Sequence, residues 1–125
     1  MPDIRRGQVH WWKCPDHNRT YVQGGVRPVV IVSNDHCNRY CKSITVVPLT
    51  TAVKLPYPER VPIIFDGKIS TALADQITTI SVDELSGFVC DLSSYQLDQI
   101  DTAIALQLGF TTIYDHPYAW SHKKD

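Results

Sequence analysis

The sequence predicts a mainly β protein with short helices, in the form of a small β-barrel with one amphipathic helix appended to it. Many short, β-branched apolar runs alternate with Gly, Pro and Asp turn residues between positions 7 and 90. A helical pattern follows them at 94–108. A chain of 125 residues suits a single domain with a core of its own. Strands followed by a helix favour a barrel against which that helix packs.

The first half of the chain contains the first three expected strands, over residues 7–12, 28–32 and 44–49. Gly24-Gly25 suits a tight turn at the end of the loop between the first two. Ser33-Asn34-Asp35 offers capping or turn chemistry for a short segment that ends near Tyr40. Pro48 cannot donate to a strand ladder, so we expect the third strand to fray or to reach a sheet edge there.

The second half contains four further expected strands, over residues 61–65, 69–73, 77–80 and 88–90. Asp66-Gly67 predicts a hairpin between the first two. Ser81-x-x-Glu84 and Ser93-x-x-Gln96 both have the spacing of a capping box. The first box predicts a short helical turn and the second opens the helix, with Gly109 as its C-terminal cap. The apolar face of this helix is formed by Leu97, Ile100, Ala103, Ile104 and Leu108.

The net charge of −1 does not by itself indicate a polyanionic partner, but the charges are unevenly distributed. Residues 1–60 carry nine Lys or Arg against four Asp or Glu, whereas residues 61–122 carry one against eight. This asymmetry predicts a basic face that steers a polyanion, or two halves that interleave in the fold and cancel. No signal peptide and no apolar run near 18 residues are visible, so we expect a cytoplasmic protein without a membrane span.

The cysteines allow two interpretations. Without an export signal, free reduced thiols are our prediction. The alternative is a four-coordinate zinc site, because Cys14-x-x-His17 and His36-Cys37-x-x-x-Cys41 together supply enough ligands. This alternative requires a loop and a short helix to converge.

Four ordered blocks resemble the toxins of the MazF/PemK type. The most specific block runs from Gln23-Gly24-Gly25-Val26-Arg27-Pro28 to Asp35, and a later one ends its strand in Pro48-Leu49-Thr50. The resemblance covers roughly residues 5–110, with blocks at 6–12, 23–35, 38–50 and 72–80. It implies an SH3-like (CcdB/PemK-like) barrel domain over residues 1–111, and it leaves residues 112–125 as a tail of unassigned role.

The resemblance also implies a function. A toxin of this family is a dimeric endoribonuclease of the mRNA interferase type, which cleaves single-stranded RNA without metal or other cofactor. It is specific for sequence, and its expected products are a 2′,3′-cyclic phosphate and a 5′-OH. The implied partners are RNA, a second copy of the chain, and an antitoxin whose disordered acidic segment covers the basic RNA face.

The family's catalytic residues fall on Arg27 and Thr50. RNA carries its own nucleophile, the ribose 2′-OH, so the protein must handle protons and hold charge on the phosphate. The guanidinium of Arg27 presents a fork of donors that fits phosphate oxygens, although arginine is a poor base at neutral pH. Thr50 offers a hydroxyl held at the end of a strand. The remaining expected RNA-binding residues are Gln23, Asn34, Asp75, Gln76 and Trp12.

Trp12 enters this set because alternation along a strand turns one of Trp11 and Trp12 outward, toward the RNA groove. The residues 20–22 and Thr78 depart from the family pattern along the substrate path, which puts the sequence preference in doubt. In the tail, Tyr114, Tyr118 and Trp120 form either stacking platforms for bases or a locally packed terminus. The alternative function is a non-catalytic SH3-like binding module, or a gyrase-targeting toxin of the same fold.

Overall fold

The structure is a computed structural model that describes residues 3–15, 25–52 and 58–111. Every strand and helix expected from the sequence is present, and a short 3₁₀ turn, η1, is an addition. In chain order the elements are β1 (Gln8–Cys14), β2 (Gly25–Ile31), α1 (Asp35–Tyr40), β3 (Ser43–Thr50), β4 (Arg60–Phe65), β5 (Lys68–Leu73), η1 (Ala74–Gln76), β6 (Thr78–Ser81), η2 (Val82–Glu84), β7 (Leu85–Asp91) and α2 (Ser94–Gln107).

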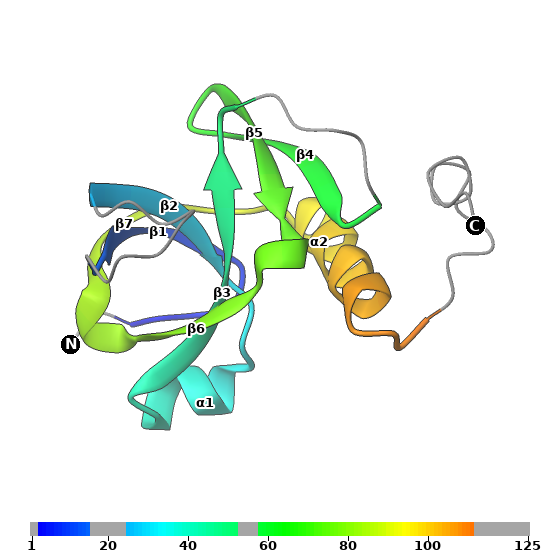
Figure 1. The fold of residues 1–125 in the computed structure, drawn as a ribbon. Helices are drawn as coiled ribbons and strands as arrows, with labels where there is room; N and C mark the ends of the chain where they lie inside the picture. The colour runs from blue at the N-terminus through cyan, green and yellow to red at the C-terminus, as the bar shows by residue number, and fades with distance from the viewer. Residues whose placement is uncertain (1–2, 16–24, 53–57, 112–125) are drawn as a thin grey trace.

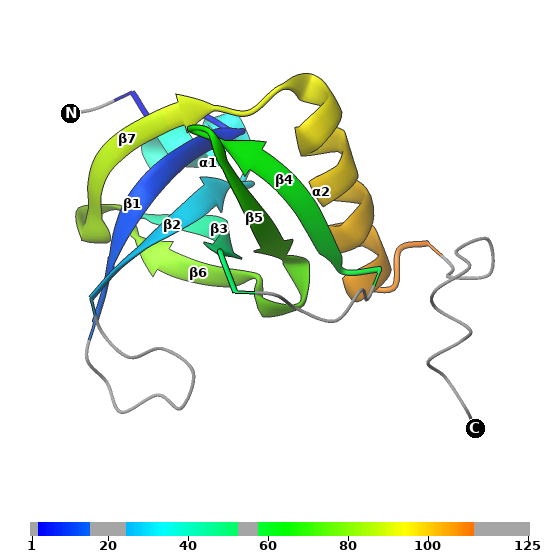
Figure 2. The same cartoon turned by 90° about the horizontal axis from the view of Figure 1, so that it is seen from above.

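The strands form an antiparallel sheet that curls into a half-barrel (Figure 1). Its order is β4-β5-β3-β2-β1-β7, and β6 also pairs with β3. β6 continues through η2 into β7, which pairs with β1 at the other side of the sheet. This connection links the end strand β7 to the strand that pairs with β3. Seen from above, α2 lies beside β4 at one end of the molecule (Figure 2).

The two faces of the central strands bury two separate cores. On the concave face the core lies between β1, β2, β3 and β6, and consists of Ile4, Trp12, Cys14, Val29, Ile31, Ile44, Val46 and Ile80. On the other face the core lies under β4, β5 and α2, and consists of Val9, Val30, Val47, Leu49, Val61, Ile63, Phe65, Ala72, Ala74, Ile100 and Ala103. Both sides of β2 and β3 are therefore apolar over much of their length, which explains the continuous apolar run of β2.

The hairpin between β4 and β5 has the geometry that its sequence predicts. Asp66 and Gly67 have φ angles of 51° and 74°. Positive φ at both central residues is the conformation of a type I′ turn, which Asp-Gly favours.

The helix α2 begins and ends as predicted. Ser93 Oγ accepts a hydrogen bond from Gln96 N–H at 3.1 Å, and Gln96 Oε1 accepts one from Ser93 N–H. Gly109 follows the helix with a φ of 79°. Leu108 is a correction, because it was expected on the buried face and is 50% exposed. It is the C-cap residue, where the chain leaves the helix and its side chain no longer follows the buried stripe.

β3 was expected to fray or to reach a sheet edge at Pro48, and the first of these alternatives is wrong. β3 continues to Thr50, and Pro48 is buried opposite Val29 of β2. On its other side β3 pairs with β6 up to Val46 and with β5 from Leu49. Pro48 thus falls where one ladder is interrupted, a position that tolerates a residue without an N–H.

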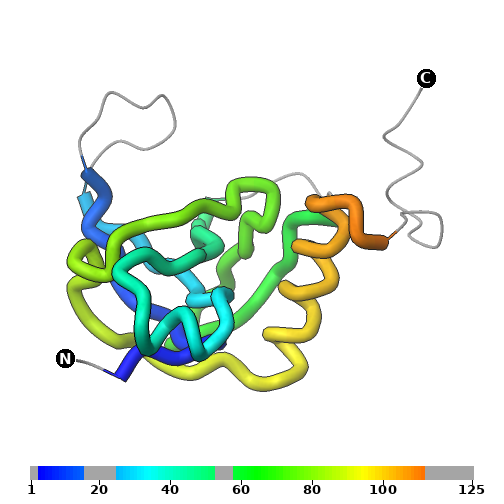
Figure 3. Tube along the Cα trace, turned by 90° about the horizontal axis from the view of Figure 1, so that it is seen from below, coloured from blue at the N-terminus to red at the C-terminus, as the bar shows by residue number. Residues whose placement is uncertain are grey.

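Arg6 connects the start of the chain to both helices. Its backbone N–H donates to Asp35 Oδ1 of α1 at 2.7 Å, and its guanidinium pairs with Asp101 of α2. Seen from below, α1 lies beside these N-terminal residues (Figure 3). A second pair, Arg60 with Asp75 at 3.0 Å, joins β4 to η1. Both pairs match an arginine of the basic half with an acid of the acidic half, so the two halves interleave at these points.

Several predictions fall outside the described residues. These are the tail at 112–125, the loop residue Gln23 and the departures at 20–22. In the part of the chain that the structure describes, no helix is long and apolar enough to cross a membrane.

Candidate active site

The register of β2 and β3 relates the two predicted catalytic residues. Val29 pairs with Pro48, and each step along β2 is matched by one step back along β3. The same register, continued two residues toward the open end of the pair, sets Arg27 opposite Thr50. Directly opposite residues of antiparallel strands project from the same face of the sheet. Arg27 and Thr50 therefore belong to one face, the concave face that carries Val29.

Thr50 is held at the last position of β3 and is partly buried. Its Oγ1 accepts a hydrogen bond from the N–H of Ala52 at 3.1 Å. A threonine hydroxyl has one hydrogen to donate besides its acceptor lone pairs. Because the backbone occupies an acceptor position, the hydroxyl hydrogen is left to be donated elsewhere.

Arg27 lies among side chains of β1 and η2. Its cross-strand partner on the concave face is Trp12, and Cys14 follows two residues further along β1. Burial raises the pKa of the Cys14 thiol, while the positive charge of Arg27 opposes that rise and the negative charge of Glu84 adds to it. The thiol of Cys14 is therefore influenced by the charges of both Arg27 and Glu84.

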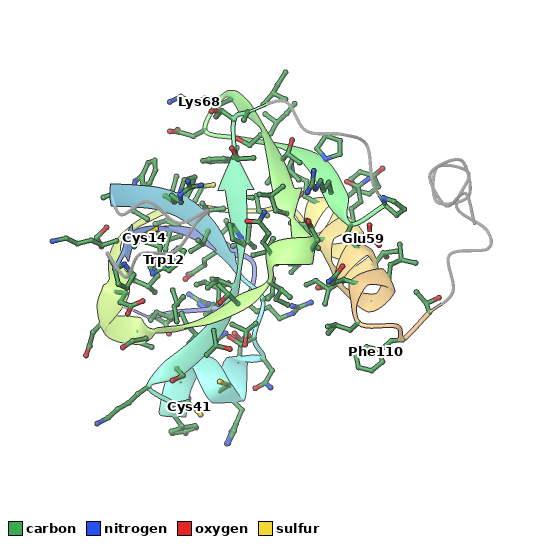
Figure 4. The ribbon with its side chains drawn as sticks, viewed as in Figure 1. Trp12, Cys14, Cys41, Glu59, Lys68 and Phe110 are labelled. Atoms are coloured by element: carbon green, nitrogen blue, oxygen red, sulfur yellow. The ribbon has the colours of Figure 1, made fainter. Side chains whose placement is uncertain are left out.

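Trp12 points inward, which corrects its expected place in an RNA groove. Its side chain is 6% exposed, and its indole N–H donates to Glu84 Oε1 at 2.9 Å. The outward member of the pair is Trp11, which is 38% exposed. Trp12 and Cys14 lie near each other toward the concave side of the sheet (Figure 4). Trp12 is therefore a core residue at the strand position that pairs with Arg27, and it offers no exposed face for stacking.

η1 brings Gln76 toward the end of β3 that carries Thr50. In β5, Thr71 pairs with Thr50 and Ala72 pairs with Leu49 of β3. After η1 the chain pairs with β3 again, through Thr78 of β6 and Val46. η1 lies between these two points. Gln76, the last residue of η1, is partly buried.

The carboxylate of Asp75 is engaged by an arginine. Arg60 donates to it through Nη2 at 3.0 Å and Nε at 3.4 Å, and both side chains are largely shielded from solvent. The pair ties η1 to the start of β4. Asp75 and Arg60 thus fix the position of the neighbouring Gln76, and an RNA contact by Asp75 would compete with this ion pair.

Asn34 does not lie with the other predicted residues. It follows the far end of β2 from Arg27, seven residues away, or roughly 20 Å of extended chain. Its Oδ1 caps α1 by accepting the Cys37 N–H at 2.8 Å. Arg27 and Thr50 thus lie toward one end of β2 and β3, and Asn34 lies beyond the other, while Gln76 lies on η1 between the segments that pair with Leu49 and Val46. Gln23 is outside the described residues.

Sequence reasoning missed Glu84 and Arg60 as neighbours of the site. Glu84 was interpreted as the fourth residue of a capping box. Ser81 does cap η2, but through the N–H of Asp83 at 3.2 Å, and Glu84 turns instead to Trp12. No local signal distinguishes these outcomes, because the competing partner is 72 residues away in sequence.

Of the residues considered as zinc ligands, His17 lies outside the described residues, and Cys14 does not converge with Cys37 and Cys41. Cys14 ends β1, whereas Cys37 and Cys41 lie in and directly after α1, on another side of the molecule (Figure 4). Within residues 3–15, 25–52 and 58–111 there is no group of three or more His, Cys, Asp or Glu that could hold a metal ion. The four cysteines, each in a described range, are free thiols.

The curled half-barrel sheet with a C-terminal helix is a fold that this chain shares with known toxins. Residues 5–108 match the model of the PemK-like, MazF-like toxins of type II toxin–antitoxin systems, and the chain belongs to this family. A relative named endoribonuclease MazF, from Staphylococcus epidermidis, is 34% identical over 118 residues, covering 90% of this chain and 97% of the relative. Another of the same name, from Staphylococcus saprophyticus, is 34% identical over 99 residues, covering 75% and 82%.

Solved structures confirm the fold. A mycobacterial endoribonuclease in complex with its cognate antitoxin superposes with a TM-score of 0.72 at 29% identity, covering 87% of this chain and 98% of that one. MazF from Deinococcus radiodurans superposes with a TM-score of 0.75 at 20% identity, covering 87% and 99%. The predicted barrel with its C-terminal helix is therefore the fold of this family.

Proposed function

We propose that this chain is a toxin that cleaves single-stranded RNA at preferred sequences, without a metal ion, and leaves 2′,3′-cyclic phosphate and 5′-OH ends. The observation that supports the proposal is the register of β2 and β3, which pairs Val29 with Pro48 and which, extended by two residues, would set Arg27 opposite Thr50. The family supports it, because the staphylococcal relatives are named endoribonucleases.

The reaction needs no nucleophile from the protein. The ribose O2′ attacks the adjacent phosphorus, the O2′–P bond forms and the P–O5′ bond breaks. The 2′-OH loses its proton, and the departing 5′ oxygen gains one. Charge accumulates on the non-bridging oxygens, and the forked donors of Arg27 stabilise it there. The hydroxyl of Thr50, whose oxygen already accepts from Ala52, can donate its hydrogen to the phosphate or to the departing oxygen.

The test is cleavage of a mixed RNA pool by the purified full chain, followed by sequencing of the 5′ ends. We expect a small set of preferred sites, ends that carry 5′-OH, and the same rate in the presence of EDTA. Arg27→Ala should lower the rate by at least about 100-fold, the usual cost of removing one donor to a developing anion.

Arg5→Ala is the matched control, because Arg5 is an exposed arginine paired with Asp3. Its cleavage rate should stay at the wild-type value, and circular dichroism should give the same spectrum for both variants. RNA left intact by the wild-type chain after prolonged incubation would contradict the proposal and favour a non-catalytic binding module. Cleavage abolished by EDTA would contradict the metal-independent part alone.

The same proposal includes two protein partners. An antitoxin with an acidic segment would cover the RNA-binding face, as suggested by the mycobacterial endoribonuclease solved with its cognate antitoxin. A second copy of the chain would cover apolar surface that stays exposed on β4, β5 and α2, where Ile64, Ile69 and Tyr95 are 60%, 73% and 70% exposed. A monomeric mass by light scattering at micromolar concentration would argue against the homodimer.

A further inference from the structure

Two cysteines lie four residues apart at the end of α1, Cys37 within the helix and Cys41 directly after it as the C-cap residue. The N–H of Cys41 donates to the carbonyl of Cys37 at 2.8 Å, which fixes the i to i+4 relation of a helix. Side chains in this relation share a face, with Cβ atoms about 5–6 Å apart. Cys41 is exposed, and Cys37 is partly buried with its thiol directed at the carbonyl of Ser43 at 3.3 Å.

The side chains around this pair limit the number of ligands to two. His36, the nearest histidine in sequence, has its ring against the ring of Tyr40, with centroids 5.0 Å apart. Adjacent helical residues project about 100° apart, so His36 turns away from the face of the two thiols. In the described part of the chain no third metal-binding side chain joins Cys37 and Cys41.

Two thiolates and no further ligand select a particular kind of cation. Zinc takes four ligands in structural sites, and Mg²⁺ and Ca²⁺ prefer oxygen. Soft thiolates favour Cu(I), which accepts a two-coordinate, linear arrangement. Two metal–sulfur bonds of about 2.3 Å separate the sulfur atoms by about 4.6 Å, a span that side chains one helical turn apart can match.

We propose that Cys37 and Cys41 form a two-thiolate site for a soft monovalent cation of the Cu(I) type. The cation binds both sulfur atoms and displaces the two thiol protons to solvent, without any change of oxidation state. The Cys37 sulfur exchanges its contact with the Ser43 carbonyl for the metal. Burial, and next the neighbouring Cys41 side chain, raise the pKa of Cys37.

The test is competition for Cu(I) between the reduced full chain and a coloured Cu(I) chelator, bathocuproine disulfonate, in the absence of oxygen. We expect the wild-type chain to withdraw one equivalent. Cys37→Ser and Cys41→Ser should each weaken binding by more than about 100-fold, since even outer-shell changes cost 10- to 100-fold. Circular dichroism establishes that each variant is folded, and a serine at an exposed or half-buried position should leave the spectrum unchanged.

Cys90→Ser is the matched control, because Cys90 is a half-buried thiol on β7, outside α1. It should bind Cu(I) as the wild type does. The proposal would be overturned if the double variant of Cys37 and Cys41 still took up Cu(I), or if Cys90→Ser lost Cu(I) binding to the same extent as Cys37→Ser and Cys41→Ser. It would also be overturned if the wild-type chain left the chelator saturated with Cu(I). One equivalent of zinc bound as tightly as Cu(I) would overturn it too, because zinc needs further ligands. The result is independent of RNA cleavage.

Discussion

Two serines with different hydrogen bonding make opposite contributions to stability. Ser70 Oγ lies in the core beside β4, and the described residues offer it no hydrogen-bond partner. Ser33 Oγ donates to Asn38 Oδ1 at 2.5 Å and accepts the Thr45 N–H at 3.0 Å. Removing an unpaired hydroxyl relieves a desolvation cost, whereas removing a paired one leaves its partners unsatisfied.

We therefore expect Ser70→Ala to raise the free energy of unfolding by up to about 1 kcal/mol, and Ser33→Ala to lower it by about 1 kcal/mol. Urea denaturation of both variants measures the two changes. Equal destabilisation by both substitutions would show that Ser70 has a partner after all.

His10 makes stability depend on pH. Its side chain is 3% exposed, and its Nε2 lies 2.8 Å from Gln8 Oε1. That atom of Gln8 also accepts the N–H of Arg5, which identifies it as the oxygen and His10 Nε2 as the donor. Burial lowers the pKa of His10 from 6.5, and the charge of Asp91 only partly opposes this shift.

At a pH near or below 6.5 the unfolded chain therefore binds more protons than the folded chain, so stability rises with pH. The contribution of His10 to stability is complete above the pKa that this residue has in the unfolded chain. It is lost as the pH falls toward the lower pKa that His10 has in the folded chain. We expect a lower unfolding midpoint at about pH 5.5 than at about pH 7.5, and a smaller difference in His10→Gln. His36→Gln, at an exposed histidine, should retain the wild-type difference.

At the scale of elements, the ion pair between β4 and η1 positions the segment that carries Gln76. Arg60 and Asp75 are 19% and 27% exposed, so solvent screens their attraction only in part. We expect a double-mutant cycle of Arg60→Gln and Asp75→Asn to give a coupling energy of about 1 kcal/mol in urea unfolding. Each single variant should also lower the RNA cleavage rate, because η1 loses its tether.

Additive effects of Arg60→Gln and Asp75→Asn would contradict this role of the pair. Gln76→Ala provides the comparison in the cleavage assay, since it removes the positioned side chain itself. If η1 is positioned by the pair, the variants at 60 and 75 should not lower the rate further in the Gln76→Ala background.

Turns and helix ends that are determined by residues close together in sequence were predictable from the sequence. Asp66-Gly67 determines its own turn through positive φ, and Ser93 with Gln96 closes a capping box over one turn of chain. Ser81 and Glu84 have the same spacing, yet the glutamate bonds to Trp12 instead. A tertiary partner with a hydrogen-bond donor outweighs a local one here, and the sequence spacing carries no information about it.

At the scale of the whole molecule, strand pairing decides which predicted residues share a site. Arg27 and Thr50 are 23 residues apart in sequence, and the antiparallel register of β2 and β3, extended by two residues, sets them opposite each other. Asn34 belongs to the same block as Arg27 but lies beyond the other end of β2. Alternation predicted one inward tryptophan in β1, and only the packing of η2 identifies it as Trp12. Long-range pairing is the information that single-sequence patterns lack.

Charge distribution over the whole molecule bears on how RNA binding responds to salt. The net charge is −1, and Arg6 and Arg60 are paired with Asp101 and Asp75. Few arginines of the described chain are therefore available to contact phosphate. We expect the affinity for RNA to depend only weakly on salt concentration. For single strands each phosphate contact contributes about 0.7 to the slope of log K against log salt concentration. If Arg27 holds one phosphate, Arg27→Gln should reduce the slope by about that amount.

The measurement is binding of an uncleavable RNA with methylated 2′ oxygens, over roughly 50 to 200 mM salt. The methylated sugar removes the nucleophile, so affinity is measured without turnover. Arg5→Gln, at an exposed arginine paired with Asp3, should leave the slope unchanged. An unchanged slope in Arg27→Gln, together with lost cleavage, would assign Arg27 to the reacting group without a ground-state phosphate contact. If Arg27→Gln and Arg5→Gln reduced the salt slope equally, the result would instead indicate that the basic half of the chain attracts RNA through its overall charge.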